Sequence, residues 1–174
     1  MLAACGGADT SHMQSDWELK NAGRLAKEKS DQAIVALPRF PRAERLLPFT
    51  VGTANFSFLI DRDSVRVDDD RIVRYAMVAR SPNGVENVSF EGINCQAGEY
   101  AVYAVGREDG SWVRRPHAWR PIERRTMHGA HQALQRDYFC PRGIAIASAA
   151  EGVKALETGG HPLTQGPVPP SGPR

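Results

Sequence analysis

Two histidines in one short segment are the first residues whose spacing could do chemistry. His128 and His131 are three positions apart, so a helix would place both imidazoles on one face, and Asp137 follows nearby. Zinc requires three or four such ligands. Gly129 weakens a helix between the two imidazoles, and the cysteines of the chain have better uses. We therefore predict no metal site and no cofactor, and we expect exposed histidines at the start of a helix.

One of the three cysteines lies close to the N-terminus. Cys5 ends the segment Leu2–Cys5 and precedes a glycine pair, which resembles the lipobox of bacterial lipoproteins. Small residues before the cysteine suit the processing peptidase, and the thiol is the nucleophile that takes the lipid. The charged and apolar parts of a signal peptide do not precede it, so we expect the precursor to begin upstream of Met1. Gly6, rather than Asp, after the cysteine favours the periplasmic face of the outer membrane.

The other two cysteines, Cys95 and Cys140, are then left as a pair. In an oxidising compartment a disulfide between them is the simpler interpretation. The alternative is a nucleophilic thiol at Cys140, which has Arg136 and Arg142 close in sequence and His131 nine residues upstream. We predict the disulfide.

A basic segment with interleaved tryptophans is the candidate partner-binding face. Its residues are Trp112, Trp119, Arg120, Arg124 and Arg125. Basic and aromatic side chains together can bind nucleic acid or an acidic glycan. The alternative is an edge strand protected by charge, with the tryptophans packed on a sheet face. Lys and Arg number 22 and Asp and Glu number 20, a balance that argues against nucleic acid.

An acidic cluster at Asp61, Asp63 and Asp68–Asp70 could suggest calcium. It lacks the alternating ligands, the central glycine and the closing glutamate of an EF-hand loop. We expect solvated turns here. The sequence also contains no P-loop, dinucleotide fingerprint, G-x-S-x-G elbow or HExxH motif.

Strand-forming segments separated by short turns must position these groups. Strands are predicted at 55–61, 64–67, 71–80, 85–95, 99–107, 112–114 and 118–122. Segment 71–80 is apolar on one side and mixed on the other, which suits a central, half-covered strand. An apolar stripe predicts a helix from Met127 to Tyr138, and a capping box from Ser148 to Glu151 starts another. The predicted fold is α+β, an antiparallel meander of five to seven strands packed by one or two C-terminal helices.

The chain of 174 residues suits one domain with distinct ends. Residues 1–33 are predicted to hold the lipobox and a polar stalk, with a possible helix at 15–29. Residues 34–158 form the globular domain, which begins with an extended linker at 37–41. Residues 159–174, rich in proline and glycine, read as a flexible tail. No apolar run approaches the roughly 20 residues that span a bilayer.

A series of landmarks across residues 37–158 resembles one known family. The landmarks include Leu46–Phe49, Phe58–Asp61, Asn87–Ile93, Cys95, Gly106–Arg107, Trp112, Trp119 and Asp137–Pro141. Their order and spacing are similar to the cryptic neisserial protein family of envelope proteins, for which no activity is established. The resemblance implies an envelope location and supports the pairing of Cys95 with Cys140.

Together these features predict a periplasmic lipoprotein tethered to the outer membrane. We expect a non-catalytic binding or scaffolding accessory in an envelope assembly, with a lipid anchor in the membrane, an envelope protein partner and no nucleic acid. The alternative is an envelope hydrolase acting on cell-wall material, with Glu91, Asp137 or His131 as acid or base. A pocket joining two titratable side chains would favour the hydrolase, and a flat apolar or basic patch would favour the scaffold.

Overall fold

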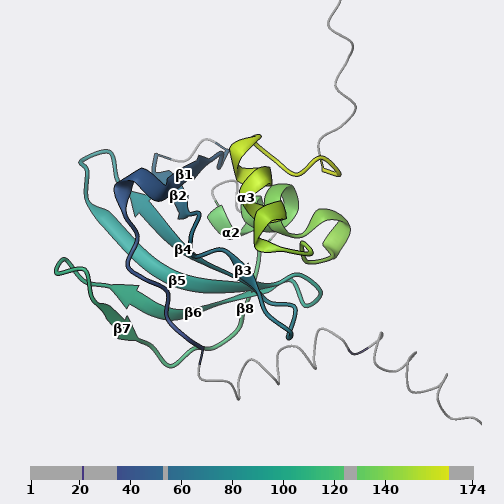
Figure 1. Cartoon of the computed structure of the whole chain (residues 1–174), viewed down its shortest axis with the longest axis horizontal. Coiled ribbons are helices and arrows are strands. Elements are labelled where there is room, and N and C mark those ends of the chain that lie inside the picture. The colour runs from purple at the N-terminus through teal and green to yellow at the C-terminus, as the bar shows by residue number, and fades with distance from the viewer. Residues whose placement is uncertain (1–20, 22–34, 53–54, 124–128, 165–174) are drawn as a thin grey trace, which may run out of the picture.

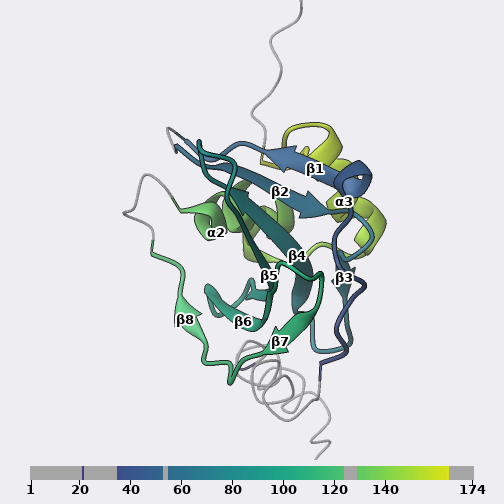
Figure 2. The same cartoon turned by 90° about the vertical axis from the view of Figure 1, so that its left-hand side faces the viewer.

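The sheet of this protein is antiparallel and carries its helices on one face (Figures 1 and 2). The computed structural model describes residues 21, 35–52, 55–123 and 129–164. Eight strands lie within these residues: β1 (Leu46–Phe49), β2 (Ser57–Asp61), β3 (Arg66–Val67), β4 (Val73–Arg80), β5 (Glu86–Asn94), β6 (Glu99–Gly106), β7 (Trp112–Arg114) and β8 (Arg120–Pro121). The predicted α+β class is confirmed, and the strand count is one above the predicted range.

The strand order is β1-β2-β4-β5-β6-β7, so β4 and β5 lie at the centre. β3 continues the edge of β4, and β8 continues the edge of β6 beyond β7. β3 therefore pairs with the part of β4 that β2 leaves unpaired, and β8 pairs with the part of β6 that β7 leaves unpaired. The strand that the sequence did not reveal is β1, which contains Pro48. Proline is tolerated there because β1 is an edge strand, where a missing N–H need not break the ladder.

The helical layer follows the sheet in sequence. α2 (Ala130–Ala133) continues directly into the π-helical segment η2 (Leu134–Phe139), and the 3-10 turn η3 (Pro141–Gly143) follows. α3 (Ala149–Glu157) begins at the predicted cap, where the Ser148 hydroxyl accepts a hydrogen bond from the Glu151 N–H at 3.3 Å. A second 3-10 turn, η1 (Ala43–Arg45), precedes β1.

Both faces of the central strand β4 are covered. Val73, Tyr75 and Met77 face the main core beneath the helices. Ala76 faces a second core, in which the segment at 35–37 packs across the sheet (Figure 1). The prediction of a half-covered strand is therefore wrong, because the segment expected to be a linker folds back over the open face. Arg74 on that face is 1% exposed and pairs with Asp68 and Asp70.

The acidic cluster consists of ion-pair and turn residues, of which Asp61 and Asp70 are largely buried and Asp63, Asp68 and Asp69 are exposed. Asp68 and Asp70 neutralise the buried Arg74 guanidinium, and Asp63 pairs with Arg45. Asp61 is 4% exposed and accepts a hydrogen bond from the Asp63 N–H at 3.2 Å. Burial raises the pKa of the Asp61 carboxyl. The expectation of solvated turns is therefore wrong for Asp61 and Asp70, but it holds for Asp63 and Asp68, whose side chains are 48% and 45% exposed.

The described chain continues past the predicted end of the domain. His161 is 5% exposed, and the Thr164 hydroxyl donates to the Asp137 carbonyl at 3.0 Å. Residues 159–164 therefore pack on the domain instead of belonging to a free tail. Cys5, the polar stalk apart from Asn21, and residues 165–174 lie outside the described residues. Among the helices described, none has the length and hydrophobicity to cross a membrane.

Candidate functional site

A buried carboxylate on β5 is the starting point of the candidate site. Glu91 is 3% exposed, at the buried end of β5, where Asn94 is the other polar side chain. The pairing of β5 with β6 shifts register between Phe90 and Glu91, which marks a bulge. Bulges re-aim side chains and are frequent beside functional sites. Glu91 lies directly opposite Tyr75 on β4 and therefore faces the helical layer.

Glu91 pairs with the first histidine of the helical layer. One carboxylate oxygen, Oε2, lies 2.7 Å from Nε2 of His131 on α2, although the two residues are 40 positions apart in sequence. The Tyr75 hydroxyl donates to the same oxygen at 3.2 Å, and the Ser89 hydroxyl donates to Oε1 at 2.7 Å. A buried carboxylate is stable as an anion only where donors or a cation compensate for lost water. Around Glu91, the Tyr75 hydroxyl, the Ser89 hydroxyl and the His131 imidazole take the place of the lost water.

Tyr75 and His131 meet the same carboxylate oxygen of Glu91. Burial, reinforced by the nearby Glu91 carboxylate, raises the pKa of the Tyr75 hydroxyl well above its usual value. Tyr75 therefore keeps its proton and donates a hydrogen bond to Glu91. The Glu91 carboxylate also lies within hydrogen-bonding distance of Nε2 of His131 and so orients the imidazole ring, as carboxylates do for histidines in other sites. Within the described residues, Nε2 is the ring nitrogen of His131 that has a hydrogen-bond partner.

The imidazole of His131 also lines a cavity of about 410 Å³ between the sheet edge and α2. Tyr100 stacks on the imidazole with 3.7 Å between ring centroids and 17° between planes. The cavity is lined further by Arg120, Ile122, Glu123 and Gln132. Its volume falls within the usual range for small-molecule sites, roughly 300–1,000 Å³. A held imidazole in such a wall can bind a polar ligand or transfer a proton.

The predicted partner-binding residues divide between core and surface. Trp112 packs against Phe40 and Phe90, and its indole N–H donates to the Pro38 carbonyl at 3.0 Å. Trp119 packs against the same second core. Arg120 is exposed and reaches the cavity rim from β8. Arg124 and Arg125 lie outside the described residues. Both tryptophans thus follow the alternative interpretation of side chains packed on a sheet face.

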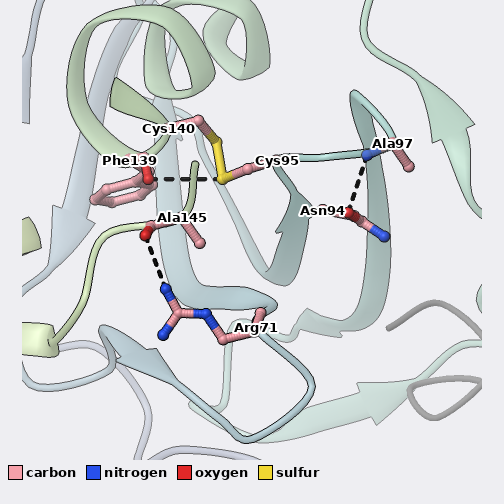
Figure 3. Close-up of a disulfide and its surroundings, with 7 residues drawn as sticks. All are labelled: Arg71, Asn94, Cys95, Ala97, Phe139, Cys140 and Ala145. Carbon is pink, nitrogen blue, oxygen red and sulfur yellow. Dashed lines mark hydrogen bonds between the residues drawn. A yellow bond between two sulfur atoms is a disulfide. The ribbon is translucent and has the colours of Figure 1, made fainter. Parts of the chain in front are cut away.

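The disulfide between Cys95 and Cys140 is present, as predicted, with Cα atoms 5.4 Å apart (Figure 3). It joins the end of β5 to the end of η2, so it fastens the helical layer to the sheet. The Phe139 carbonyl oxygen lies 3.6 Å from Sγ of Cys95. A second cavity, of about 430 Å³, lies beside the bridge and is lined by Arg136, Arg142 and both cysteines. The joined thiols leave no nucleophile at Cys140 while the bridge is intact.

The remaining candidates from the sequence separate from one another. The Asp137 carboxylate pairs with Arg136 on the surface and does not line the His131 cavity. His131 is half-buried, with a side chain 22% exposed, so the expectation of an exposed histidine is wrong for it. His128 lies outside the described residues, as does Cys5. Within the described part of the chain no three His, Cys, Asp or Glu residues are grouped to hold a metal ion.

The pairing of Glu91 with His131 is what sequence reasoning missed. Both residues were named as possible acids or bases, but neither was connected to the other. One signal was available, since alternation along β5 places Glu91 on the same face as Ile93, a core residue. A carboxylate in that position needs a buried partner. Which partner it has depends on how the helix crosses the sheet.

The fold and site define an α+β domain with a carboxylate–imidazole pair at the mouth of a cavity. A family model described as the CNP1-like family matches residues 26–157, most of the chain. The protein therefore belongs to the CNP1-like family, an uncharacterised bacterial family. No curated protein and no solved structure matches significantly.

Proposed function

We propose that this protein is a lipid-anchored accessory of the bacterial envelope, held at the periplasmic face of the outer membrane. It binds a partner or ligand in an envelope assembly and does not catalyse a reaction. The proposal includes the more specific likeness to neisserial envelope proteins. The Cys95–Cys140 disulfide is the observation that carries it.

The disulfide supports an oxidising compartment for a physical reason. Cytosolic thiols are kept reduced, so a bridge that fastens two layers of a domain is typical of exported proteins. The bridge also resolves the odd cysteine count, because Cys5 is the one cysteine it does not use. Cys5 stands in a lipobox-like segment, where lipid attachment is the chemistry that requires a thiol. Two acyl chains or more are needed for a stable anchor.

Metabolic labelling of the complete precursor tests the anchor. We expect radioactive palmitate on the wild-type protein, which should fractionate with outer membranes. Cys5→Ser should lose the label and appear in the periplasmic fraction, while Cys95→Ser should keep the label and serve as the matched cysteine control. Unlabelled wild-type protein, or wild-type protein in the cytoplasm, would contradict the proposal.

Partner capture tests the binding role. Arg120 is the exposed member of the predicted binding face within the described residues. Arg120→Glu should reduce in-cell crosslinking to an envelope partner, because it reverses a charge at the cavity rim. Arg107→Glu, at another exposed arginine on the β6–β7 turn, is the control and should leave capture unchanged. Equal capture by both variants would remove Arg120 from the binding face.

An envelope hydrolase is the second candidate function, and the Glu91–His131 pair favours it. A base held by a carboxylate beside a cavity is an arrangement that general acid–base catalysis uses. Release of soluble fragments from isolated cell walls tests it. Fragment release by wild-type protein that is abolished in His131→Gln would favour the hydrolase over the binding role. Binding without fragment release would favour the accessory.

A further inference from the structure

Residues 35–42, the strap, cross the face of the sheet away from the helices without joining any described helix or strand (Figure 1). Exposed side chains recur at every third position of the strap, at Ala36, Arg39 and Arg42. The other five residues of the strap are buried or partly buried. A polyproline II helix repeats every three residues, so it can present one row to solvent and two rows to a surface beneath it. The strap therefore has the exposure pattern of a polyproline-type ligand in a groove.

The two covered rows of the strap hold prolines and large apolar side chains. Pro38 and Pro41 are three positions apart in one row, and Leu37 and Phe40 precede them in the other. This is the Pro-x-x-Pro spacing of extended peptides that dock in aromatic-lined grooves. Proline has no N–H to donate, so recognition of such a backbone depends largely on its carbonyl oxygens.

The sheet supplies side-chain donors for the carbonyl oxygens of the strap. The donors lie on β3 and β7: Trp112 donates to Pro38 at 3.0 Å, Arg114 to Val35 at 2.9 Å and Arg66 to Ala36 at 2.8 Å. Contacts with main-chain carbonyls do not depend on the side chains that a peptide carries. Another extended segment with the same prolines can therefore make the same hydrogen bonds.

The groove also holds the Phe40 side chain. Its ring centroid lies 5.1 Å from that of Trp112. A Cβ at Gly106 on β6 would lie 2.8 Å from the Phe40 ring, so the glycine leaves the room that the ring needs. Glycine inside a strand often marks such a close approach. The groove thus favours a large apolar side chain before the second proline.

We infer that this groove binds an extended peptide of a partner protein, with the pattern apolar-Pro-x-apolar-Pro, and that the strap occupies the groove until the peptide displaces it. The strap precedes every described strand, so its release breaks no pairing within the sheet. Trp112, a member of the predicted binding face, then acts from within the groove. The inference rests on the proposed binding role and names the chemistry of the partner.

Fluorescence anisotropy with a labelled peptide of residues 35–42 tests the groove. Full-length Phe40→Ala, whose own strap lacks the ring, should bind this peptide at least about tenfold more tightly than wild type, because the wild-type strap competes. A peptide that itself carries Phe40→Ala should bind this variant at least about tenfold more weakly than the unchanged peptide does. Equal affinity of the two peptides, or no binding to the Phe40→Ala protein, would overturn the proposal.

Groove variants separate recognition from folding. In the Phe40→Ala protein, Trp112→Phe removes the indole N–H and Arg114→Met removes the guanidinium, so each should weaken peptide binding about fivefold, the loss of one hydrogen bond. Arg115→Met is the matched control, because Arg115 is exposed and alternation points it away from the strap. Its affinity should be unchanged. Phe40→Leu, which keeps an apolar side chain, is a second background and should give the same order of affinities. Unchanged affinity in both groove variants would overturn the groove.

Light scattering of the wild-type protein separates a partner peptide from a second copy of this chain. We expect a monomer. A dimer that Phe40→Ala abolishes would mean that two chains exchange straps, and it would overturn the partner peptide. These measurements use purified protein, so they are independent of the anchor and crosslinking tests in cells. In-cell capture of a partner without peptide binding would overturn the peptide class alone.

Discussion

Two carboxylate–imidazole pairs in this domain are built in opposite ways. In the first, Glu91 has a side chain 4% exposed and His131 is 22% exposed. In the second, His161 is 6% exposed and Glu151 is 34% exposed. Nδ1 of His161 accepts a hydrogen bond from the Leu163 N–H at 3.1 Å, while its Nε2 lies 2.8 Å from Glu151. Both nitrogens of His161 are therefore engaged, whereas only one nitrogen of His131 has a partner among the described residues.

The difference shows that the same two residue types can form a self-contained pair or a pair whose imidazole lies at a cavity. The His161 pair closes on itself and holds residues 160–164 against α3, so its imidazole has no group left for a ligand. The His131 pair buries the carboxylate and leaves the imidazole at a cavity. In each pair one side chain is buried and the other is partly exposed, and the exposed side chain is the one that solvent or another molecule can reach. Five changes should break or sharpen this contrast.

Removal of the disulfide should have the largest effect. Cys95 follows Glu91 on the sheet side, and Cys140 ends the helical segment that begins with His131, so the bridge holds the first pair together. The double variant Cys95→Ala/Cys140→Ala should lose about 4 kcal/mol of unfolding free energy by the chain-entropy relation. Urea denaturation measures this loss. A stability within about 0.5 kcal/mol of wild type would show that packing alone holds the layers.

Glu91→Ala should have the second largest effect, a loss of about 3 kcal/mol of unfolding free energy. The substitution leaves the Tyr75 and Ser89 hydroxyls and His131 without the carboxylate that they contact. Glu91→Gln keeps the size and an acceptor and is the matched control, with a smaller loss. The midpoint of urea denaturation measures both. Equal loss in the two variants would mean that the negative charge, rather than the hydrogen bonds, stabilises the site.

His161→Ala should cost about 2 kcal/mol, because it removes a buried ring together with the partner of the Leu163 N–H. Since His161 holds the last described residues, limited proteolysis should also cut the variant after Gly160 before the rest of the domain. His131→Ala should not expose that site. Cleavage that is equally fast in both variants would deny the separate roles of the two pairs.

Tyr75→Phe should lower the unfolding free energy by about 1 kcal/mol at neutral pH, because it removes one hydrogen bond to Glu91. The folded pKa of Tyr75 is raised, so the unfolded chain loses this proton first and the contribution of Tyr75 is present below the ordinary tyrosine pKa of about 10. It is lost as the pH rises through the folded value. Stability measured above pH 10 should therefore fall less steeply in Tyr75→Phe than in wild type. Identical slopes would contradict this assignment.

Glu151→Gln should have the smallest effect, below about 1 kcal/mol, because the carboxylate is partly exposed and screened by water. Burial raises the pKa of Glu151, but hydrogen bonds from the Ala147 N–H and from His161 outweigh burial and lower it overall. Its contribution is therefore present above the unfolded pKa and is lost as the pH falls through the folded value. Stability curves between pH 5 and pH 3 should be flatter in the variant. A stability curve that is steeper in Glu151→Gln than in wild type would contradict a lowered pKa of Glu151.

Much of the fold follows from local sequence because its signals act over a few residues. Asp109-Gly110 makes the β6–β7 turn with Gly110 at a φ of +80°, a conformation that glycine adopts without strain. Ser148 and Glu151 start α3 by a cap three residues long. β1 escaped prediction because Pro48 argues against a strand until its edge position is known. No local sequence pattern predicted that α2 would continue as the π-helical segment η2.

By itself the sequence determined the sheet class, the α3 cap and the Cys95–Cys140 bridge, because alternation, capping and cysteine counting need no knowledge of distant neighbours. Only the tertiary structure decided that Glu91 meets His131, that the segment at 35–37 covers the second face of β4, and that Trp112 packs, partly buried, against the second core. Each of these depends on how elements far apart in sequence cross one another. Such crossings are set by packing of the whole core, and a local pattern does not record them.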